Sequence, residues 1–237
     1  MRLLAGTSGF SYKEWKGAFY PEKARPHEML AFYASRLPVV EINNTFYRLP
    51  KPEQLREWRS QVPTTFKFAV KAPRRITHVK RLADCGAEVE YLLGALREIE
   101  PQLGSILFQL PPFQRCDVPR LAAFAALLPD GCRAAFEFRH PSWFDDAVYR
   151  VLAERNFALV LSETDESAVA GLPWTARWAY LRLRKTDYSD AELTAWLGRL
   201  AAASLEEAQV FFKHEDEAKG PLLALELLSR YSSASSS

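Results

Sequence analysis

Strand-like and helix-like segments alternate along nearly all of this 237-residue chain, and that alternation constrains the fold more than any single motif. Short runs rich in branched and aromatic residues are typical of strands, whereas apolar residues three and four apart indicate helices. The strand pattern occurs in eight segments: residues 3–6, 39–43, 66–72, 105–110, the first part of 133–143, 158–163, 179–184 and 210–213.

Helical patterns occupy most of the connections between these segments. They cover residues 26–36, 52–60, 87–100, 118–128, 147–155, 190–203 and 221–230. The sixth and seventh strands are separated by a connection with Gly171 and Pro173 in it, so a helix there is expected to be short or missing.

Eight strands alternating with helices in this length favour a (β/α)8 barrel of the TIM type over a doubly wound open sheet. The glycine-rich patterns that mark nucleotide sites in open sheets, G-x-G-x-x-G and G-x-x-x-x-G-K, follow none of the strands. We expect one barrel domain over residues 1–231. The serine-rich tail, residues 232–237, is predicted to be disordered.

Composition supports a globular, water-soluble chain and excludes several classes of function. Apolar residues make up 48% and charged residues 25%, and no run is long enough to span a membrane. The first residues lack a signal-peptide core, so a cytoplasmic location and no membrane partner are expected. The net charge of +2 does not by itself argue for nucleic acid, and the three cysteines have no metal-ligand or redox spacing.

The segment 133–143 combines a strand pattern with charged residues. Side chains alternate across a strand, so Glu137 and Arg139 share one face with Ala135, while Phe136 and Phe138 lie on the other. In a barrel the apolar face packs on the helices, which leaves the acid and the base pointing into the lumen.

If the apolar face of each strand packs on the helices, polar residues of four other strands also point into the lumen. They are Glu41 and Asn43, Lys67 and Lys71, Gln109, and Tyr180, Arg182 and Arg184. Most lie near the carboxyl ends of their strands, where barrel enzymes keep their sites. Cations outnumber acids, which suits an anionic ligand, although a buried network in which the acids merely neutralise the cations remains the alternative.

Loops at the strand ends add further candidates. The turn at residues 7–9 offers amides and hydroxyls, including that of Ser8, to an anion, and Tyr47 follows the second strand. The basic run 73–81 is either a solvated loop or a contact to phosphates. The aromatic residues between positions 10 and 20 either stack on a base or sugar, or cover the rim of the barrel.

Several short motifs resemble the domain-of-unknown-function 72 family, the YecE-like proteins. They are GTSGFSY (6–12) with Trp15, YP (20–21), EINNTFY (41–47), FKFAVK (66–71), FQLPP (108–112), EFRHPSW (137–143), YLRLR (180–184) and FKHE (212–215). The resemblance covers nearly the whole chain in order and implies a TIM-type α/β barrel. It implies no reaction.

The first hypothesis is an enzyme, hydrolase-like or lyase-like, that acts on an anionic small molecule, phosphorylated or nucleotide-like, without a cofactor. Glu137 serves as general acid or base together with Glu41, and its pKa is set by burial and by Arg139. The residues expected to bind the ligand are Ser8, Asn43, Tyr47, Lys71, Gln109, Arg139, Tyr180, Arg182, Arg184, Lys213 and His214.

Two other hypotheses stay open. One is a hydrolase or nuclease dependent on a divalent metal, with ligands drawn from Glu137, His140, Glu163, Asp165 and His214. Its weakness is that the chain has only four histidines. The other is a non-catalytic binder of single-stranded nucleic acid that uses Arg74, Arg75, Lys80 and Arg81 with the N-terminal aromatic residues.

Overall fold

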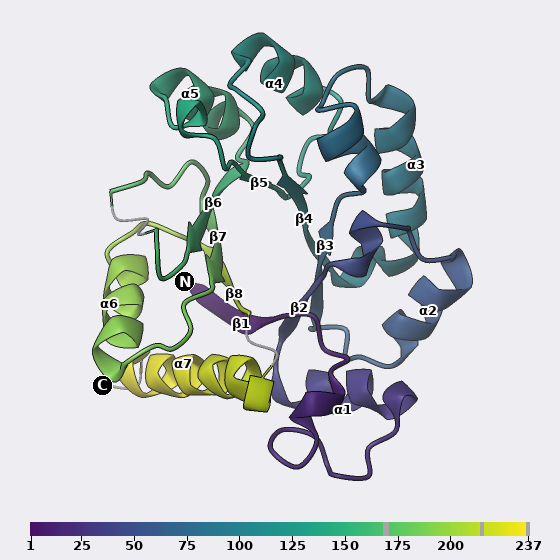
Figure 1. Ribbon diagram of the computed structural model, residues 1–237, viewed down its shortest axis with the longest axis vertical. Coiled ribbons are helices and arrows are strands. Elements are labelled where there is room, and N and C mark those ends of the chain that lie inside the picture. Colours follow the sequence, from purple (N-terminus) through teal and green to yellow (C-terminus); the bar gives the residue numbers. More distant parts are fainter. Residues whose placement is uncertain (168–170, 214–215, 236–237) are drawn as a thin grey trace.

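The computed structural model describes residues 1–167, 171–213 and 216–235, and its central feature is a closed barrel of eight parallel strands (Figure 1). Each strand pairs with the next along the chain, and β8 pairs with β1. This is the TIM-type barrel that the alternating pattern predicted. The strands are β1 (Arg2–Ser8), β2 (Val39–Ile42), β3 (Lys67–Lys71), β4 (Leu103–Gln109), β5 (Ala134–Glu137), β6 (Ala158–Glu163), β7 (Trp178–Leu183) and β8 (Glu207–Phe212).

Helices form the outer ring around the barrel (Figure 1). Several begin where the sequence supplies a capping side chain: Asp117, Asp145 and Ser189 each accept a hydrogen bond from a backbone N–H of the first turn. The α-helices are α1 (Met29–Arg36), α2 (Pro52–Ser60), α3 (Gly86–Leu96), α4 (Val118–Ala125), α5 (Asp146–Glu154), α6 (Asp190–Ala201) and α7 (Lys219–Ser235).

The connection between β6 and β7 holds no helix in the parts that are described, residues 164–167 and 171–177. Thr164 and Ser167 form an isolated antiparallel bridge there, and Thr175 bonds to the backbone of Phe157 and Leu159. The expectation of an irregular unit at this place is therefore confirmed for those residues.

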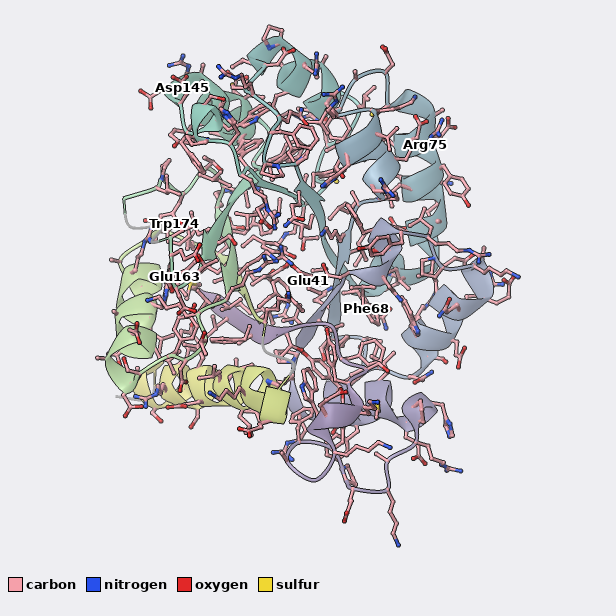
Figure 2. The ribbon with its side chains drawn as sticks, in the orientation of Figure 1. Glu41, Phe68, Arg75, Asp145, Glu163 and Trp174 are labelled. Carbon is pink, nitrogen blue, oxygen red and sulfur yellow. The ribbon has the colours of Figure 1, made fainter. Side chains whose placement is uncertain are left out.

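The apolar side chains of the strands form two layers, one between the strands and the helices and one inside the barrel. The outer layer, between strands and helices, contains Phe68, Phe108 and Phe136, and Figure 2 shows Phe68 between the barrel and α2. The inner layer fills the lumen with Leu4, Val39, Ala69, Leu107, Ala135, Ala158, Val160, Trp178, Tyr180 and Phe211. The barrel is thus packed through its middle, and polar side chains gather at its two ends.

The network at the amino-terminal end of the strands is built on Glu207. Its carboxylate accepts from Arg133 and from Gln209 Nε2 (3.0 Å), and Gln209 in turn accepts from Ser105 Oγ (2.7 Å). Lys67 lies at this end and donates to the carbonyl of Pro101. The sequence placed Lys67 in the lumen with Lys71, but the two residues lie at opposite ends of β3.

The chain ends differ in detail from the expected elements. β1 continues to Ser8, two residues beyond the predicted strand. The last helix continues to Ser235, so the described part of the predicted disordered tail, residues 232–235, is helical. Ser232 and Ser233 donate their hydroxyl protons to carbonyls one turn earlier in this helix, which gives polar side chains a local partner.

Among the residues that the structure describes, no helix is both long enough and apolar enough to cross a membrane.

Candidate functional site

A buried layer of three charged side chains occupies the lumen at the carboxyl-terminal end of the strands. Arg182, on β7, donates from Nη2 to Glu41 Oε1 and from Nη1 to Glu137 Oε2, each over 2.7 Å. All three side chains are at most 3% exposed. The arginine therefore bridges β2 and β5 across the barrel, and Figure 2 shows Glu41 near the middle of the ring of strands.

Glu41 receives hydrogen bonds at both of its oxygens. Oε1 also accepts from Ser8 Oγ (2.8 Å) and Asn43 Nδ2 (2.9 Å), and Oε2 accepts from the Tyr180 hydroxyl (2.6 Å). Ser8 and Glu41 are register partners in the β1–β2 pair, which is why their side chains meet. The Ser8 hydroxyl proton is used within the protein, so it does not remain available for a ligand in this arrangement.

Glu137 joins the layer to the neighbouring polar residues. Its Oε1 accepts from Gln109 Nε2 (2.8 Å) and, over a longer 3.4 Å, from Arg139 Nε. Gln109 accepts at Oε1 from Lys71 Nζ (2.8 Å). One chain of hydrogen bonds thus connects Lys71 to Glu137 through Gln109.

Both buried carboxyl groups are held in the ionised form. Burial alone would raise the pKa of each carboxyl group. The positive charge of Arg182 and the hydrogen bonds to the carboxylates together lower it by more than burial raises it. The net effect lowers the pKa of Glu41 and takes that of Glu137 to about 2. A carboxyl group with such a pKa has no proton to donate near neutral pH and is a weak base.

The arginines of this layer have donors that nothing in the described chain satisfies. Arg182 Nε and Arg184 Nε are buried and have no hydrogen-bond partner among the described residues. Arg184 also makes no side-chain ion pair with any of them. Burial and the neighbouring Arg182 charge lower the pKa of Arg184, because its positive charge is not fully compensated.

Lys71 lies beside the layer, next to two aromatic rings that sequence reasoning did not select. Its Nζ is 4.4 Å from the centre of the Phe46 ring, and the His78 ring packs edge-on against Phe46 at 4.8 Å. Burial, followed by the Arg182 charge, lowers the pKa of Lys71 from 10.5 to about 8. Phe46 lies within the motif EINNTFY, but period-two alternation stops at a strand end and gives no signal for it.

Three predicted ligand-binding residues do not join this cluster. Tyr47 is 77% exposed, and its ring packs edge-on against that of Phe46. The side chain of Lys213, just after β8, is exposed, with no contact to the cluster in the described chain. His214 lies outside the described residues. The cluster therefore contains Ser8, Glu41, Asn43, Lys71, Gln109, Glu137, Arg139, Tyr180 and Arg182, with Arg184 electrostatically coupled to it.

The residues named for a metal site are not brought together in the part of the chain that is described. Glu163 faces α6, where it accepts from Trp196 Nε1 over 3.0 Å. His140 bonds to Ser142, and Asp165 accepts from Thr186. No group of three or more potential protein ligands that could hold a metal occurs among the described residues.

The basic run and the N-terminal aromatic residues have structural partners. Within the run 73–81, Arg75 and Lys80 both pair with Glu88, each over 2.8 Å. Trp15, Phe19 and Tyr20 are buried in the outer layer of the core. These aromatic residues cover the barrel, so they are not free to stack on a nucleic-acid base.

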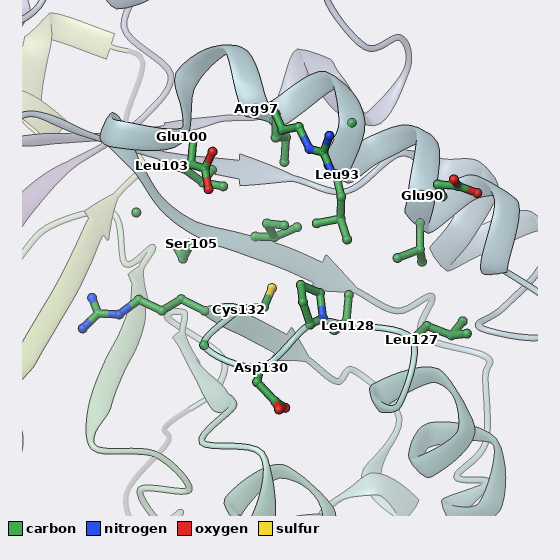
Figure 3. Close-up of a pocket in the computed structure, with 18 of the residues that line it drawn as sticks. Glu90, Leu93, Arg97, Glu100, Leu103, Ser105, Leu127, Leu128, Asp130 and Cys132 are labelled. Carbon is green, nitrogen blue, oxygen red and sulfur yellow. The ribbon is translucent and has the colours of Figure 1, made fainter.

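A cavity of about 840 Å³ lies away from this cluster, on the outside of the barrel (Figure 3). It is bounded by α3, the first half of β4 and the loop between α4 and β5. Apolar side chains such as Leu93, Leu103 and Leu128 dominate its wall. Since its lining includes none of the charged residues of the carboxyl-terminal cluster, we place the candidate site at that end of the barrel instead.

These features define an α/β barrel of the TIM type with a cluster of charged side chains, richer in cations than in carboxylates, at the carboxyl ends of its strands. The chain belongs to the DUF72 family, described as proteins of unknown function, whose model matches residues 4–236. The family resemblance of the sequence motifs is thereby confirmed.

Two named relatives share part of the sequence. The UPF0759 protein YecE of Escherichia coli is 36% identical over 113 residues, 47% of this chain, and YunF of Bacillus subtilis is 29% identical over 140 residues, 56% of this chain. The matches span 42% of YecE and 50% of YunF. A solved DUF72 family protein from Thermotoga maritima superposes with a TM-score of 0.84 at 26% identity, covering 98% of this chain and 100% of that one.

Proposed function

We propose that this protein is an enzyme that binds an anionic small molecule, phosphorylated or nucleotide-like, at the carboxyl-terminal end of the barrel. The observation that carries the proposal is an excess of positive charge. In the described chain, Lys71, Arg139, Arg182 and Arg184 lie around two carboxylates, Glu41 and Glu137, and every oxygen of these carboxylates already accepts a hydrogen bond.

Arg184 is the cation that gains most from a bound anion. Its Nε is buried and has no hydrogen-bond partner among the residues that the structure describes, and removing a charge from water without compensation is costly. A phosphate or carboxylate beside it would supply the missing charge and accept from its unsatisfied donors. Arg182 Nε is a second buried donor in the same layer.

The two glutamates act in this proposal as the groups that position Arg182. They hold its guanidinium from two sides and remain ionised, so they do not take the general acid or base role expected from the sequence. Proton transfer falls instead to a group whose pKa lies near neutrality, and Lys71, with a pKa of about 8, meets that condition.

The rim at this end supports the nucleotide-like part of the ligand class. Tyr47 follows β2 and Phe113 follows β4, and their side chains are 77% and 66% exposed. Exposed aromatic rings can stack on a base or a sugar while the arginines of the cluster bind phosphate. The rim serves here as a specificity surface and the buried layer as the anion site.

Calorimetric titration with inorganic phosphate tests the anion site directly. The wild-type protein is expected to bind phosphate, and Arg184→Gln is expected to weaken binding by about ten-fold or more, because a charged hydrogen-bond donor is lost. The control is Arg36→Gln, which removes an exposed arginine on α1. Equal affinity in wild type, Arg184→Gln and Arg36→Gln would refute the site.

A further inference from the structure

Lys71 is a partly buried amine whose hydrogen-bond acceptor is a neutral side chain. It ends β3, its Nζ donates to the neutral Gln109 Oε1 over 2.8 Å, and the Phe46 ring lies 4.4 Å from the nitrogen. No ion pair within 4.0 Å joins it to a carboxylate of the described chain. A lysine that loses part of its hydration usually gains such a partner, because an ammonium group is strongly hydrated.

Burial, more than any of the surrounding charges, favours the neutral form of Lys71. Arg182 and Arg184 oppose its protonation, whereas Glu41 and Glu137 support it, and burial exceeds each of these effects. His78, on the other side of Phe46, is itself shifted toward its neutral form by burial and then by Lys71 and Arg139. Lys71 thus shares a small region with Arg182 and Arg184. The arginines stay protonated near neutral pH, whereas Lys71 can release a proton.

The hydrogen-bond chain also fixes the position of the amine. Glu137 is an ionised acceptor, so it binds the Nε2 side of the Gln109 amide at 2.8 Å. The oxygen of that amide must then face Lys71. The amine is held by its hydrogen bond to the Gln109 amide oxygen and by the Phe46 ring. In that bond the amine is the donor, so its lone pair is unengaged whenever the amine is neutral.

We propose that Lys71 is a nucleophile that forms an imine with the aldehyde or ketone group of an anionic substrate. This inference rests on the proposed anion site. The amine nitrogen attacks the carbonyl carbon, an N–C bond forms, and the carbonyl electron pair moves to the oxygen, which takes up a proton. Loss of water from the carbinolamine then gives a protonated imine, so amine, carbonyl compound and one proton yield iminium and water.

The surrounding cations fit both halves of this step. Arg184 and Arg139 can hold the anionic end of the substrate, while burial and then the Arg182 charge lower the proton affinity of the amine. The iminium group then withdraws electrons from a neighbouring C–H or C–C bond, which permits lyase-like chemistry without a metal or an oxidant. Phe46 shields one side of the nitrogen from water.

A matched pair of probes tests the inference on the intact protein: pyridoxal 5′-phosphate and pyridoxal, which share the aldehyde and differ in the phosphate. Each is incubated with the protein near pH 7.5, the imine is reduced with borohydride, and the modified lysine is located by peptide mass spectrometry. A pKa of about 8 in place of 10.5 leaves roughly two hundred-fold more neutral amine at this pH. Lys71 is therefore expected to react well ahead of the other nine lysines.

Two variants complete the design. Lys71→Arg keeps the charge and is expected to lose the specific label while still binding inorganic phosphate. Lys67→Arg changes the lysine at the opposite end of the same strand and is expected to leave labelling of Lys71 unchanged. Because mapping on the wild-type protein already identifies the labelled residue, a poorly folded variant does not remove the test.

The outcomes separate the inference from the proposed function. Labelling of Lys71 that is about ten-fold faster with the phosphorylated probe and is slowed by inorganic phosphate supports both. Labelling of Lys71 at equal rates by both probes supports the nucleophile and contradicts the anion site. Label spread over exposed lysines, with Lys71 unmodified in a protein that binds phosphate through Arg184, overturns the inference and leaves the anion site standing.

Discussion

Arg182 shows at the scale of single residues how a barrel can keep a charge in its interior. Its guanidinium is 2% exposed, and the two carboxylates that hold it come from strands on either side of the lumen. Burial alone would lower the pKa of this arginine, but Glu41 and Glu137 raise it, so the charge is retained. Each member of the triad depends on the others, since one unpaired buried charge costs more than the pair gains.

Glu137 predicts how stability depends on pH. Its folded pKa of about 2 lies below the ordinary 4.5, so its contribution is present above pH 4.5 and is lost as pH falls toward 2. The contribution amounts to about 3 kcal/mol at neutral pH and should be about 2 kcal/mol smaller at pH 3 than at pH 6. Urea unfolding of wild type and Glu137→Gln at both pH values isolates it. A wild-type-minus-variant difference that does not change with pH would contradict the assignment.

Sequence reasoning placed most of these residues correctly because a strand has only two faces. Alternation sent Glu41, Gln109, Glu137 and Arg182 inward, and the structure has all of them in one network. Alternation could not show that every oxygen of the two glutamates already accepts a hydrogen bond, since that depends on the register between neighbouring strands. It also could not find Phe46 or His78, which lie in turns where side-chain direction follows no simple period.

The element that depends most on a single residue is β1, at its contact with β2. A Cβ atom on Gly6 would lie 1.9 Å from the carbonyl oxygen of Val39 and 2.9 Å from the Tyr33 hydroxyl. That hydroxyl accepts from the backbone N–H of Thr7 and donates to the Val39 carbonyl, so it joins the two strands to α1. Glycine is required here by a close approach of backbones.

Two alanine substitutions test this close approach. Gly6→Ala is expected to destabilise the protein by about 3 kcal/mol or more, at the upper end of overpacking effects, because backbone atoms must move. Gly198→Ala, on the exposed side of α6, meets no atom within 4 Å and should stabilise by about 0.5–1 kcal/mol. Thermal or urea unfolding of both variants measures the contrast. Similar small effects from both would show that β1 and β2 can separate freely.

Element boundaries were predictable only where a local signal exists. α2 and β6 begin and end where the pattern predicted, at Pro52–Ser60 and Ala158–Glu163. The turn at Arg75–Val79 is a π-helix, which has no sequence signature in the basic run. α7 extends into the serine-rich segment because serine hydroxyls can bond within a helix as well as in a coil.

At the scale of the whole molecule, the packed middle of the lumen separates two polar ends with different environments. At the amino-terminal end, Glu207 is paired with Arg133 and Gln209. At the carboxyl-terminal end, Arg184 has a buried donor with no partner in the described part of the chain. Barrels of this type keep binding residues at the carboxyl end of the strands and stabilising residues at the amino end. The paired Glu207 at one end and, among the described residues, the unpaired Arg184 donor at the other agree with that division.

This division predicts opposite effects for two substitutions. Glu207→Gln removes the central acceptor of a partly exposed network and should lower the free energy of unfolding by about 1–2 kcal/mol, leaving phosphate affinity within about two-fold. Arg184→Met removes a partly buried charge that is not fully compensated and should raise stability by about 1 kcal/mol, while phosphate affinity falls about ten-fold or more. Urea unfolding and calorimetry on the same preparations measure both quantities. If Arg184→Met destabilised the protein as much as Glu207→Gln, Arg184 would be a structural residue, and the excess of charge at this end of the barrel would need no ligand to explain it.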